Sequence, residues 1–218
     1  MTQDIFLVGA GGFAREIYEL LIKQINHLMV DTGHEPAYRV LGCLDDDPHA
    51  LDGKKTDLKI VGTIRDFEIR PEHRFVMGIA KPQTKEKLVK ILEDRGAVFE
   101  TVVHPWVNIV DGATYGRGFI AYPGATIGPD VHIGNFVTLL ATGLGHDVQV
   151  GDYCTISSYC GINGYVQLAD RVFVGGHAVI MPSVKVKEDA YIGMGSAVIT
   201  NVKAGTRVFG NPAKRMDF

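Results

Sequence analysis

A histidine and a carboxylate stand next to each other in the second half of the sequence, as Gly145-His146-Asp147. Histidine is well suited to take a proton from a nucleophile near neutral pH, because its unperturbed pKa is about 6.5. Asp147 can reach the ring of His146 only if the chain bends there, because neighbouring side chains of a straight strand point to opposite faces. His146 is therefore a candidate general base, and a solvent-exposed histidine beside a solvated carboxylate is the alternative.

A glycine-rich segment near the N-terminus is the second feature that could do chemistry. Gly9-x-Gly11-x-x-Ala14 follows the apolar run 5–8 and precedes an amphipathic run, in the order of a dinucleotide-binding fingerprint. Glycines let the backbone approach a phosphate, and a helix N-terminus favours negative charge. Asp45 ends the next predicted strand, where such folds bind a ribose.

An NAD-binding domain is one interpretation of this segment. Against it, about 100 residues hold only half of a doubly wound sheet, and no separate hydride-acceptor domain follows. A diphosphate-linked sugar would use the same backbone contacts and needs less room.

Residues 1–103 alternate between short apolar runs and amphipathic runs, which predicts a small α/β domain with a parallel sheet. The predicted strands span 5–8, 39–44, 58–61 and 75–79, and the predicted helices span 15–21 and 85–95. Gly96 directly follows the second helix and suits its C-terminal cap. These elements must position the glycine-rich segment and the carboxylates Asp45 and Asp46.

From about residue 105 the sequence repeats with a period of six. Apolar residues, mostly Ile, Leu or Val, occupy every sixth position, and a mostly small series follows four places after each. The first series is Ile109, Tyr115, Ala121, Ile127, Ile133 and Leu139 and, after one five-residue step, Leu144, Val150, Ile156, Ile162, Leu168, Val174, Ile180, Val186, Ile192, Val198 and Ala204. The second includes Ala125, Val131, Val137, Val148, Cys154, Cys160, Val166, Val172, Ala178, Val184 and Ala190.

A sustained period of six fits neither an α-helix nor an ordinary strand, and it indicates a triangular prism of stacked coils. The aliphatic residue points into the prism, the small residue sits where little room remains, and the glycine that often follows the aliphatic residue tolerates the corner dihedrals. We assign this β-helix to residues 104–206 and a C-terminal tail to 207–218. His146 lies outside the apolar phase, directly after the five-residue step, so its ring is expected to project outward.

The composition argues against several classes of protein. A net charge of −3 over 218 residues gives no reason to expect nucleic acid or an anionic membrane as a partner. Three cysteines are too few and wrongly spaced for a disulfide framework or a zinc site, so no metal is expected, and Cys154 and Cys160 fit the small packing series. No apolar stretch reaches the roughly 18 residues that span a bilayer, and no signal peptide is evident, so a cytoplasmic location is expected.

Several short motifs, taken in order, resemble the sugar acyltransferases typified by sialic-acid O-acetyltransferase and the bacillosamine-pathway N-acetyltransferase. They are Val8-Gly-Ala-Gly-Gly-Phe13, Gly42-Cys-Leu-Asp-Asp-Asp-Pro48, His104-Pro105, Gly145-His146-Asp147 and Val208-Phe-Gly-Asn-Pro-Ala-Lys-Arg-Met216. Each motif is weak alone, but together, around a hexapeptide repeat, they are specific to the family and not to a substrate. The resemblance covers nearly the whole chain. It implies a left-handed parallel β-helix, a winding that the period does not supply, and homotrimers with acetyl-CoA in the groove between neighbouring prisms.

The resemblance also implies roles for residues of the β-helix. His146 is expected to act as the base in acyl transfer from a thioester, with Asp147 orienting the ring and stabilising its protonated form. Contacts to acetyl-CoA are expected at Thr155, Gly164, Gly176, His177, Met194 and Lys214. His177 is also the rival candidate for the base. Family members often carry an asparagine shortly before the histidine; this sequence has none there, and Thr142 is a candidate substitute.

In the N-terminal domain, the resemblance implies binding of a nucleotide-linked amino sugar at Gly11, Gly12 and Phe13, with Asp45 and Asp46 at the base or ribose. A simple turn before Pro48 is the alternative for the two aspartates. Family members often have a histidine where this chain has Phe13, so the sugar and the nucleotide are left open.

The expected activity is acetyl-CoA-dependent N-acetylation of a nucleotide-linked amino sugar of the 4-amino-4,6-dideoxyhexose class. O-acetylation of a sugar hydroxyl and a non-catalytic β-helix binding trimer are the alternatives.

Overall fold

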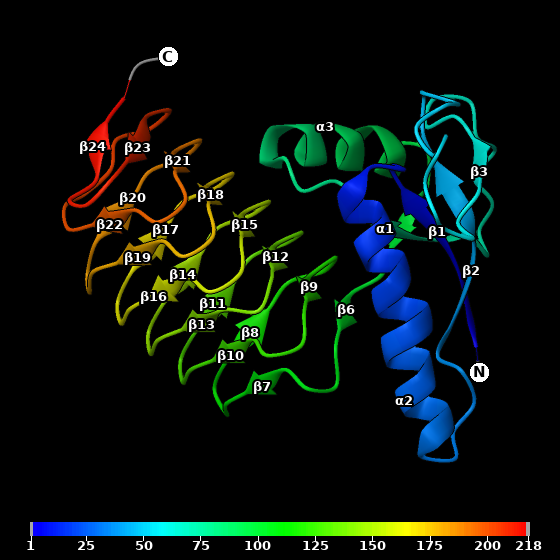
Figure 1. Cartoon of the computed structure of the whole chain (residues 1–218), viewed down its shortest axis with the longest axis horizontal. Coiled ribbons are helices and arrows are strands. Elements are labelled where there is room, and N and C mark those ends of the chain that lie inside the picture. Colours follow the sequence, from blue (N-terminus) through cyan, green and yellow to red (C-terminus); the bar gives the residue numbers. More distant parts are fainter. Residues whose placement is uncertain (1, 217–218) are drawn as a thin grey trace. The chain divides into compact units, whose positions relative to one another are not determined.

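The computed structural model describes residues 2–216 and divides into two compact units. The first consists of the residues up to Ala80 together with Thr84–Glu100, and the second of Lys81–Gln83 together with the residues from Thr101 onward. Figure 1 shows a sheet with helices in the first unit and a stack of coils in the second. Each unit has its own core of buried apolar side chains.

The first unit is built on a parallel sheet in the order β3-β2-β1-β4-β5. Its strands are β1 (Gln3–Val8), β2 (Tyr38–Leu44), β3 (Ile60–Gly62), β4 (Arg74–Met77) and β5 (Val98–Phe99), and its helices are α1 (Gly12–Glu19), the π-helical η1 (Leu20–Ile25), α2 (Asn26–Asp31) and α3 (Pro82–Glu93). The order of the strands reverses beside β1, since β2 and β3 lie on one side of it and β4 and β5 on the other. Sheets of this kind bind ligands beyond the carboxyl ends of the strands at such a reversal, and the glycine-rich segment directly follows β1.

The first unit confirms the predicted α/β pattern, with differences at the boundaries. The helix predicted over 15–21 begins at Gly12 and continues through η1 and α2 to Asp31. Leu20, Leu21 and Ile25 are buried at spacings of three, four and eight residues from the buried Ile17, so one apolar face continues through the π turn. Strand β5 was not predicted, because it is only two residues long.

The cap at the end of α3 is as predicted. Gly96 has φ +90, its N–H donates to the Glu93 carbonyl, and the N–H of Ala97 donates to the Leu92 carbonyl. A residue with a side chain would be strained in this conformation, so glycine is the suitable residue here.

The second unit is a left-handed parallel β-helix, as the resemblance implied (Figure 1). Among the described residues, one sheet runs β7-β10-β13-β16-β19-β22, a second β8-β11-β14-β17-β20, and a third β6-β9-β12-β15-β18-β21-β23-β24. The strands are β6 (Val102–Val103), β7 (Asn108–Ile109), β8 (Thr114–Tyr115), β9 (Ile120–Ala121), β10 (Thr126–Ile127), β11 (His132–Ile133), β12 (Thr138–Leu139), β13 (Gly143–Leu144), β14 (Gln149–Val150), β15 (Thr155–Ile156), β16 (Gly161–Ile162), β17 (Gln167–Leu168), β18 (Phe173–Val174), β19 (Val179–Ile180), β20 (Lys185–Val186), β21 (Tyr191–Ile192), β22 (Ala197–Val198), β23 (Arg207–Phe209) and β24 (Lys214–Arg215). The last strand, β24, runs antiparallel to β23.

The interior of the β-helix follows the predicted series in its middle coils. From Ala121 to Val198 every residue of the first series is buried, and Cys154 and Cys160 are buried free thiols as expected. Burial raises the pKa of the Cys160 thiol, so it stays protonated. Paired residues lie 18 apart, as in Leu144 and Ile162 (162 − 144), but 17 apart across the five-residue step, as in Ile127 and Leu144 (144 − 127).

The ends of the stack depart from the predicted series. Ala204 is exposed, so its assignment to the interior is wrong; Val202 and Val208 take the buried positions because the turn after β22 is shorter than the repeat. Tyr115 is 45% exposed because β8 is the edge strand of its sheet.

The glycines after the aliphatic positions have a different cause from the predicted one. The left-handed dihedrals occur two residues later, mostly at residues with side chains, such as Asp130 (φ 57) and His177 (φ 59). A Cβ on Gly145 would lie 2.9 Å from the N of Gly164 on the next coil. Close approach of neighbouring coils, rather than the corner dihedral, therefore accounts for glycine at position 145.

His104 gives the β-helix a testable pH dependence. Its side chain is buried, Nδ1 accepts a hydrogen bond from the Trp106 N–H at 3.0 Å, and burial lowers the pKa of His104 below its ordinary value of 6.5. The unfolded chain then binds more protons than the folded chain below about pH 6.5, so stability falls as the pH decreases through that region. We expect the thermal unfolding midpoint to decrease between about pH 7.5 and 5.5, and His104→Asn to weaken this dependence. An equally steep decrease in the variant would contradict the assignment.

None of the helices in the described residues 2–216 is long and apolar enough to cross a membrane. The same residues contain no group of three or more His, Cys, Asp or Glu side chains arranged to hold a metal ion.

Candidate active site

The structure brings His146 and Asp147 together at the corner that follows β13. Asp147 has φ +58, and this bend turns its carboxylate back to the ring, so that His146 Nδ1 lies 2.8 Å from Asp147 Oδ2. The His146 side chain is 56% exposed and that of Asp147 is 39% exposed. The bend that this pairing requires is therefore present, and the imidazole projects outward from the prism, as expected, with its second nitrogen, Nε2, away from the carboxylate.

The ring of His146 lies over the next coil. Gly164 is beneath it, and the ring of Tyr165 stands edge to face with it at a centroid separation of 5.0 Å and an interplanar angle of 87°. The predicted site residue Gly164 thus belongs to the same corner as the His146–Asp147 pair. Tyr165 was not predicted; counting one coil of 18 residues on from Asp147 would have found it.

Thr142 is not part of this cluster. Its side chain is buried, and its hydroxyl donates to the Cys160 carbonyl at 2.7 Å. The proposed substitute for the missing asparagine is therefore engaged inside the coil stack rather than with His146.

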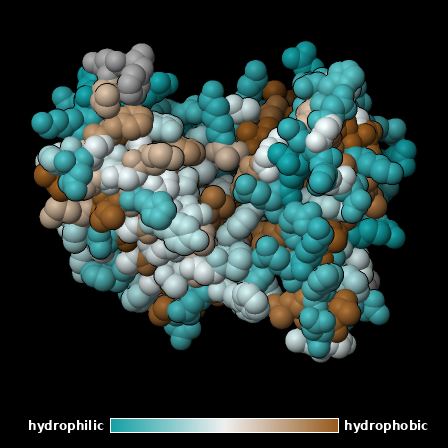
Figure 2. All heavy atoms as spheres, in the orientation of Figure 1, coloured by the Kyte–Doolittle hydropathy of each residue, from teal (hydrophilic) through white to brown (hydrophobic). Residues whose placement is uncertain are grey.

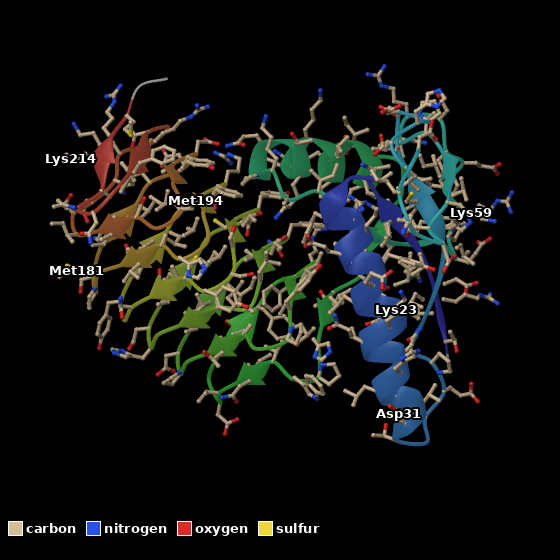
Figure 3. All side chains as sticks on the ribbon, in the orientation of Figure 1. Lys23, Asp31, Lys59, Met181, Met194 and Lys214 are labelled. Atoms are coloured by element: carbon tan, nitrogen blue, oxygen red, sulfur yellow. The ribbon has the colours of Figure 1, made fainter. Side chains whose placement is uncertain are left out.

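Three of the residues predicted to contact acetyl-CoA lie together at a different corner, which precedes β16, β19 and β22. Gly176 and Met194 occupy equivalent places on successive coils, and His177 follows Gly176 with its ring 5.2 Å from that of Tyr159. His177 is exposed, and Met194 is 77% exposed (Figure 3). Since His146 lies at the corner after β13 and His177 at the corner before β19, the two rings flank opposite ends of the strands of one face.

Three backbone N–H groups at these corners have no carbonyl partner among residues 2–216. Those of Gly164, Gly176 and Met194 donate to no carbonyl in the described part of the chain. Unpaired N–H groups at the surface can donate to a ligand, such as a carbonyl of a pantetheine arm. Gly176, which is half-buried, and Met194, which is exposed, therefore suit the predicted contacts to acetyl-CoA, whereas Gly164 is buried beneath the His146 ring.

Thr155 and Lys214 differ from them. Thr155 lies on β15 with 2% exposure, and its N–H donates to the Val172 carbonyl, so neither its N–H nor its side chain is open to a ligand. Lys214 is exposed on β24, near the end of the coil stack (Figure 3).

The glycine-rich segment forms the start of α1. Gly11 is the N-cap residue, and no side chain caps the first N–H groups of the helix. Gly11 and Gly12 are both exposed. A Cβ on Gly11 would meet no atom within 4 Å, so the backbone here faces open space. Phe13 follows, half-buried, in the first turn. The segment thus offers bare backbone and a helix N-terminus at the carboxyl end of β1.

The two predicted aspartates make loop contacts. Asp45 Oδ2 accepts the Ala10 N–H at 2.7 Å and Asp45 Oδ1 accepts the Asp47 N–H at 3.0 Å, so this carboxylate ties the end of β2 to the glycine-rich segment. Asp46 Oδ1 accepts the Ile64 N–H at 2.9 Å, and its other oxygen faces Arg65 at 3.5 Å. Asp45 therefore holds the glycine-rich segment in place. It lies at the position predicted for ligand binding, and its bond to the Asp47 N–H also gives it part of the turn role that was the alternative.

Arg15 is a second residue that the sequence did not single out. It lies in the first turn of α1, and its Nη2 is 3.8 Å from the place a Cβ on Gly12 would take. Its Nε is buried without a hydrogen-bond partner in the described residues. A cation beside the glycine-rich segment adds positive charge where an anionic ligand is expected.

Comparison with known proteins gives matches to both units. Residues 4–92 match the family model of the PglD N-terminal domain. The sequence is 32% identical over 219 residues to GDP-perosamine N-acetyltransferase from Escherichia coli O157:H7, an alignment that covers 96% of this chain and 95% of that protein.

Solved structures also match the fold over the whole chain. WeeI from Acinetobacter baumannii AYE is similar with a TM-score of 0.82 and 27% identity, covering 99% of this chain and 100% of that one. PerB from Caulobacter crescentus, solved in complex with CoA and GDP-perosamine, is similar with a TM-score of 0.80 and 22% identity, covering 100% of this chain and 99% of that one.

Proposed function

Because this chain belongs to the family of hexapeptide-repeat sugar acyltransferases that includes GDP-perosamine N-acetyltransferase, it is an acyltransferase, and we propose that it moves the acetyl group of acetyl-CoA to the amine of a nucleotide-linked amino sugar. The observation that carries the proposed chemistry is the contact between His146 Nδ1 and Asp147 Oδ2 on an exposed corner. The name of the E. coli relative supports an amine as the acceptor and guanosine diphosphate as the carrier. The proposed sugar class is a 4-amino-4,6-dideoxyhexose.

The proposed reaction is a direct transfer. The Asp147 carboxylate accepts Nδ1–H of His146, which leaves the lone pair on Nε2 free to take a proton. The sugar amine attacks the thioester carbonyl as it loses a proton to Nε2, and a C–N bond forms. The tetrahedral intermediate then expels CoA as a thiolate, which takes the proton back from the imidazolium. Asp147 favours this cycle because its negative charge stabilises the protonated ring.

The intermediate carries a negative oxygen that needs hydrogen-bond donors. The N–H of Gly164 donates to no carbonyl in the described residues and lies beside the His146 ring, and it is the proposed donor. A backbone donor is held by the coil and needs no reorganisation during the reaction. In this mechanism, therefore, one corner supplies both the base and the oxyanion donor.

We further propose that the active form is a homotrimer. The predicted acetyl-CoA contacts at Gly176, His177 and Met194 lie at a different corner from His146, so one chain presents two parts of a site at two edges of a face. Three flat faces suit a threefold assembly in which the corner of one prism meets that of the next. Exposed apolar side chains such as Val179 (47%) and Met181 (48%, labelled in Figure 3) could be buried in such contacts. Figure 2 shows hydrophobic residues scattered among hydrophilic ones on the surface.

The first unit would hold the nucleotide-linked sugar. Diphosphate oxygens would face the backbone of Gly11 and Gly12 and the positive end of α1, with Arg15 as a nearby cation. Asp45 would act through the glycine-rich segment, by its bond to the Ala10 N–H.

A substitution at Asp45 tests this role. Asp45→Ala is expected to raise KM for the nucleotide sugar by about tenfold or more, because hydrogen bonds to a charged group are worth about 1.5–3 kcal/mol. KM for acetyl-CoA should stay the same. Asp47→Ala is the matched control, since Asp47 Oδ1 accepts the His49 N–H within the same exposed turn and makes no bond to the glycine-rich segment in the described residues. Equal effects of the two substitutions would argue against a special role for Asp45.

The proposed function is tested by incubating the protein with acetyl-CoA and with UDP-, GDP- or dTDP-linked 4-amino-4,6-dideoxyhexoses. The expected product gains one acetyl group on nitrogen, seen by mass and by its resistance to mild base. Acetylation of a hydroxyl would favour the O-acetyltransferase alternative. Absence of CoA binding in calorimetry would favour a non-catalytic trimer and overturn the proposal.

A further inference from the structure

The fold alone does not explain glycine at position 164. The corner that carries His146 repeats on successive coils, and the equivalent places hold Pro129, His146, Gly164 and Pro182. This corner position therefore accepts proline and histidine. The φ of Gly164 also lies outside the left-handed region, so its backbone conformation does not demand glycine.

What a side chain at position 164 would meet is the imidazole of His146. A Cβ there would lie 2.6 Å from both Cε1 and Nε2 of the ring and 3.1 Å from Cδ2. By contrast, a Cβ on Gly145 would meet the backbone of the next coil. The missing side chain of Gly164 thus leaves the space in which the ring lies.

The ring is bounded on two further sides. Asp147 Oδ2 holds Nδ1 at 2.8 Å, and the Tyr165 ring stands against the imidazole edge to face. The N–H of Tyr165 donates to the His146 carbonyl at 3.1 Å, which fixes the two coils to each other at this point. Nε2 has no hydrogen-bond partner in the described residues.

We infer that Gly164, with Tyr165, is a positioning residue that seats the His146 imidazole on the next coil, so that Asp147 holds Nδ1 and Nε2 is left for the substrate. This inference rests on the proposed role of His146 as the base. It adds a specific requirement: position 164 must have no side chain, and position 165 must have a ring. Gly164 acts through His146 in this respect, in addition to its backbone N–H.

Gly164→Ala is the direct test. The new methyl group would displace the far end of an exposed side chain, so the fold should be kept and only the ring should move. We expect kcat to fall by about 100-fold, since a displacement of about 1 Å at a catalytic group can cost this much. KM for both substrates should change by no more than about twofold. In NMR spectra of ¹⁵N-histidine-labelled protein, the His146 ring signals should shift.

Two other substitutions complete the test. Pro182→Ala places an alanine at the equivalent corner position of the next coil, where no imidazole lies, and should leave kcat unchanged. Tyr165→Phe should retain activity and Tyr165→Ala should lose part of it, because the contact is made by the ring and not by the hydroxyl.

The outcomes separate this inference from the proposed function. Wild-type kcat in Gly164→Ala, with His146→Ala inactive, would overturn the inferred positioning role of Gly164. The proposed role of His146 as the base would then still hold. A raised KM for acetyl-CoA with kcat retained would also overturn it, because the methyl group would then be blocking the cosubstrate. If His146→Ala itself kept full activity, the proposed base would fail instead.

Discussion

His146→Ala is expected to lower kcat by about 10²- to 10⁴-fold, the usual contribution of a positioned general base. The substitution removes the proposed acceptor of the proton that the attacking amine loses. The fold should be unaffected, because the side chain is 56% exposed and contributes nothing to the interior of the prism. Rates are to be measured under saturating acetyl-CoA and nucleotide sugar, with binding of both checked separately by calorimetry.

Two other histidines serve as comparisons. His132→Ala removes an exposed ring whose Nδ1 lies 2.8 Å from Thr114 Oγ1, and it should leave kcat within about twofold of wild type. His177→Ala tests the rival base; as a contact to acetyl-CoA, it should raise KM for that substrate more than it lowers kcat. Full loss of turnover in His177→Ala together with an active His146→Ala would mean that His177, and not His146, is the base.

Ile156→Ala is expected to lower the free energy of unfolding by about 2–5 kcal/mol, the usual cost of truncating a fully buried aliphatic side chain. Ile156 is 0% exposed and stands in register between Leu139 on one neighbouring coil and Val174 on the other. The cavity would weaken both contacts between coils. Since each coil of a solenoid contacts only its neighbours, the loss should also make unfolding less cooperative. Chemical denaturation followed by circular dichroism measures both effects.

Ile199→Ala is the matched control, because the same two residue types are exchanged at a site that is 49% exposed. It should change the free energy of unfolding by no more than about 0.5 kcal/mol. Similar losses in both variants would mean that the interior series does not carry the stability of the stack.

The interior of the β-helix could be predicted from the sequence because each coil must fill the same interior space with side chains of similar size. An inward position must be aliphatic, and this leaves a period of six that survives one short step at residues 139–144. The prediction was wrong at Ala204, where the turn after β22 is shorter and the phase changes. The cause assigned to the glycines was also wrong, because the close approach of coils is a contact between residues far apart in sequence.

The candidate site was less accessible to sequence reasoning. The pairing of His146 with Asp147 requires the left-handed dihedral at Asp147, which no local pattern indicates. Tyr165 and Gly164 reach the ring from the next coil, so only a count of 18 residues connects them to it. Asp45 could be placed at the end of its strand, but its bond to the Ala10 N–H depends on how two strands stand side by side.

The antiparallel direction of β24 bears on whether copies of the β-helix pair at their C-terminal ends. A stack of parallel strands leaves a row of unpaired amide and carbonyl groups at its final edge, and such edges recruit other chains into aggregates. Here the chain folds back across β23 and presents Lys214 and Arg215, both exposed, as its outermost pair. Charged residues on an edge strand, Lys in particular, disfavour pairing with another chain, so this turn works against edge-to-edge growth of the sheet that contains β23.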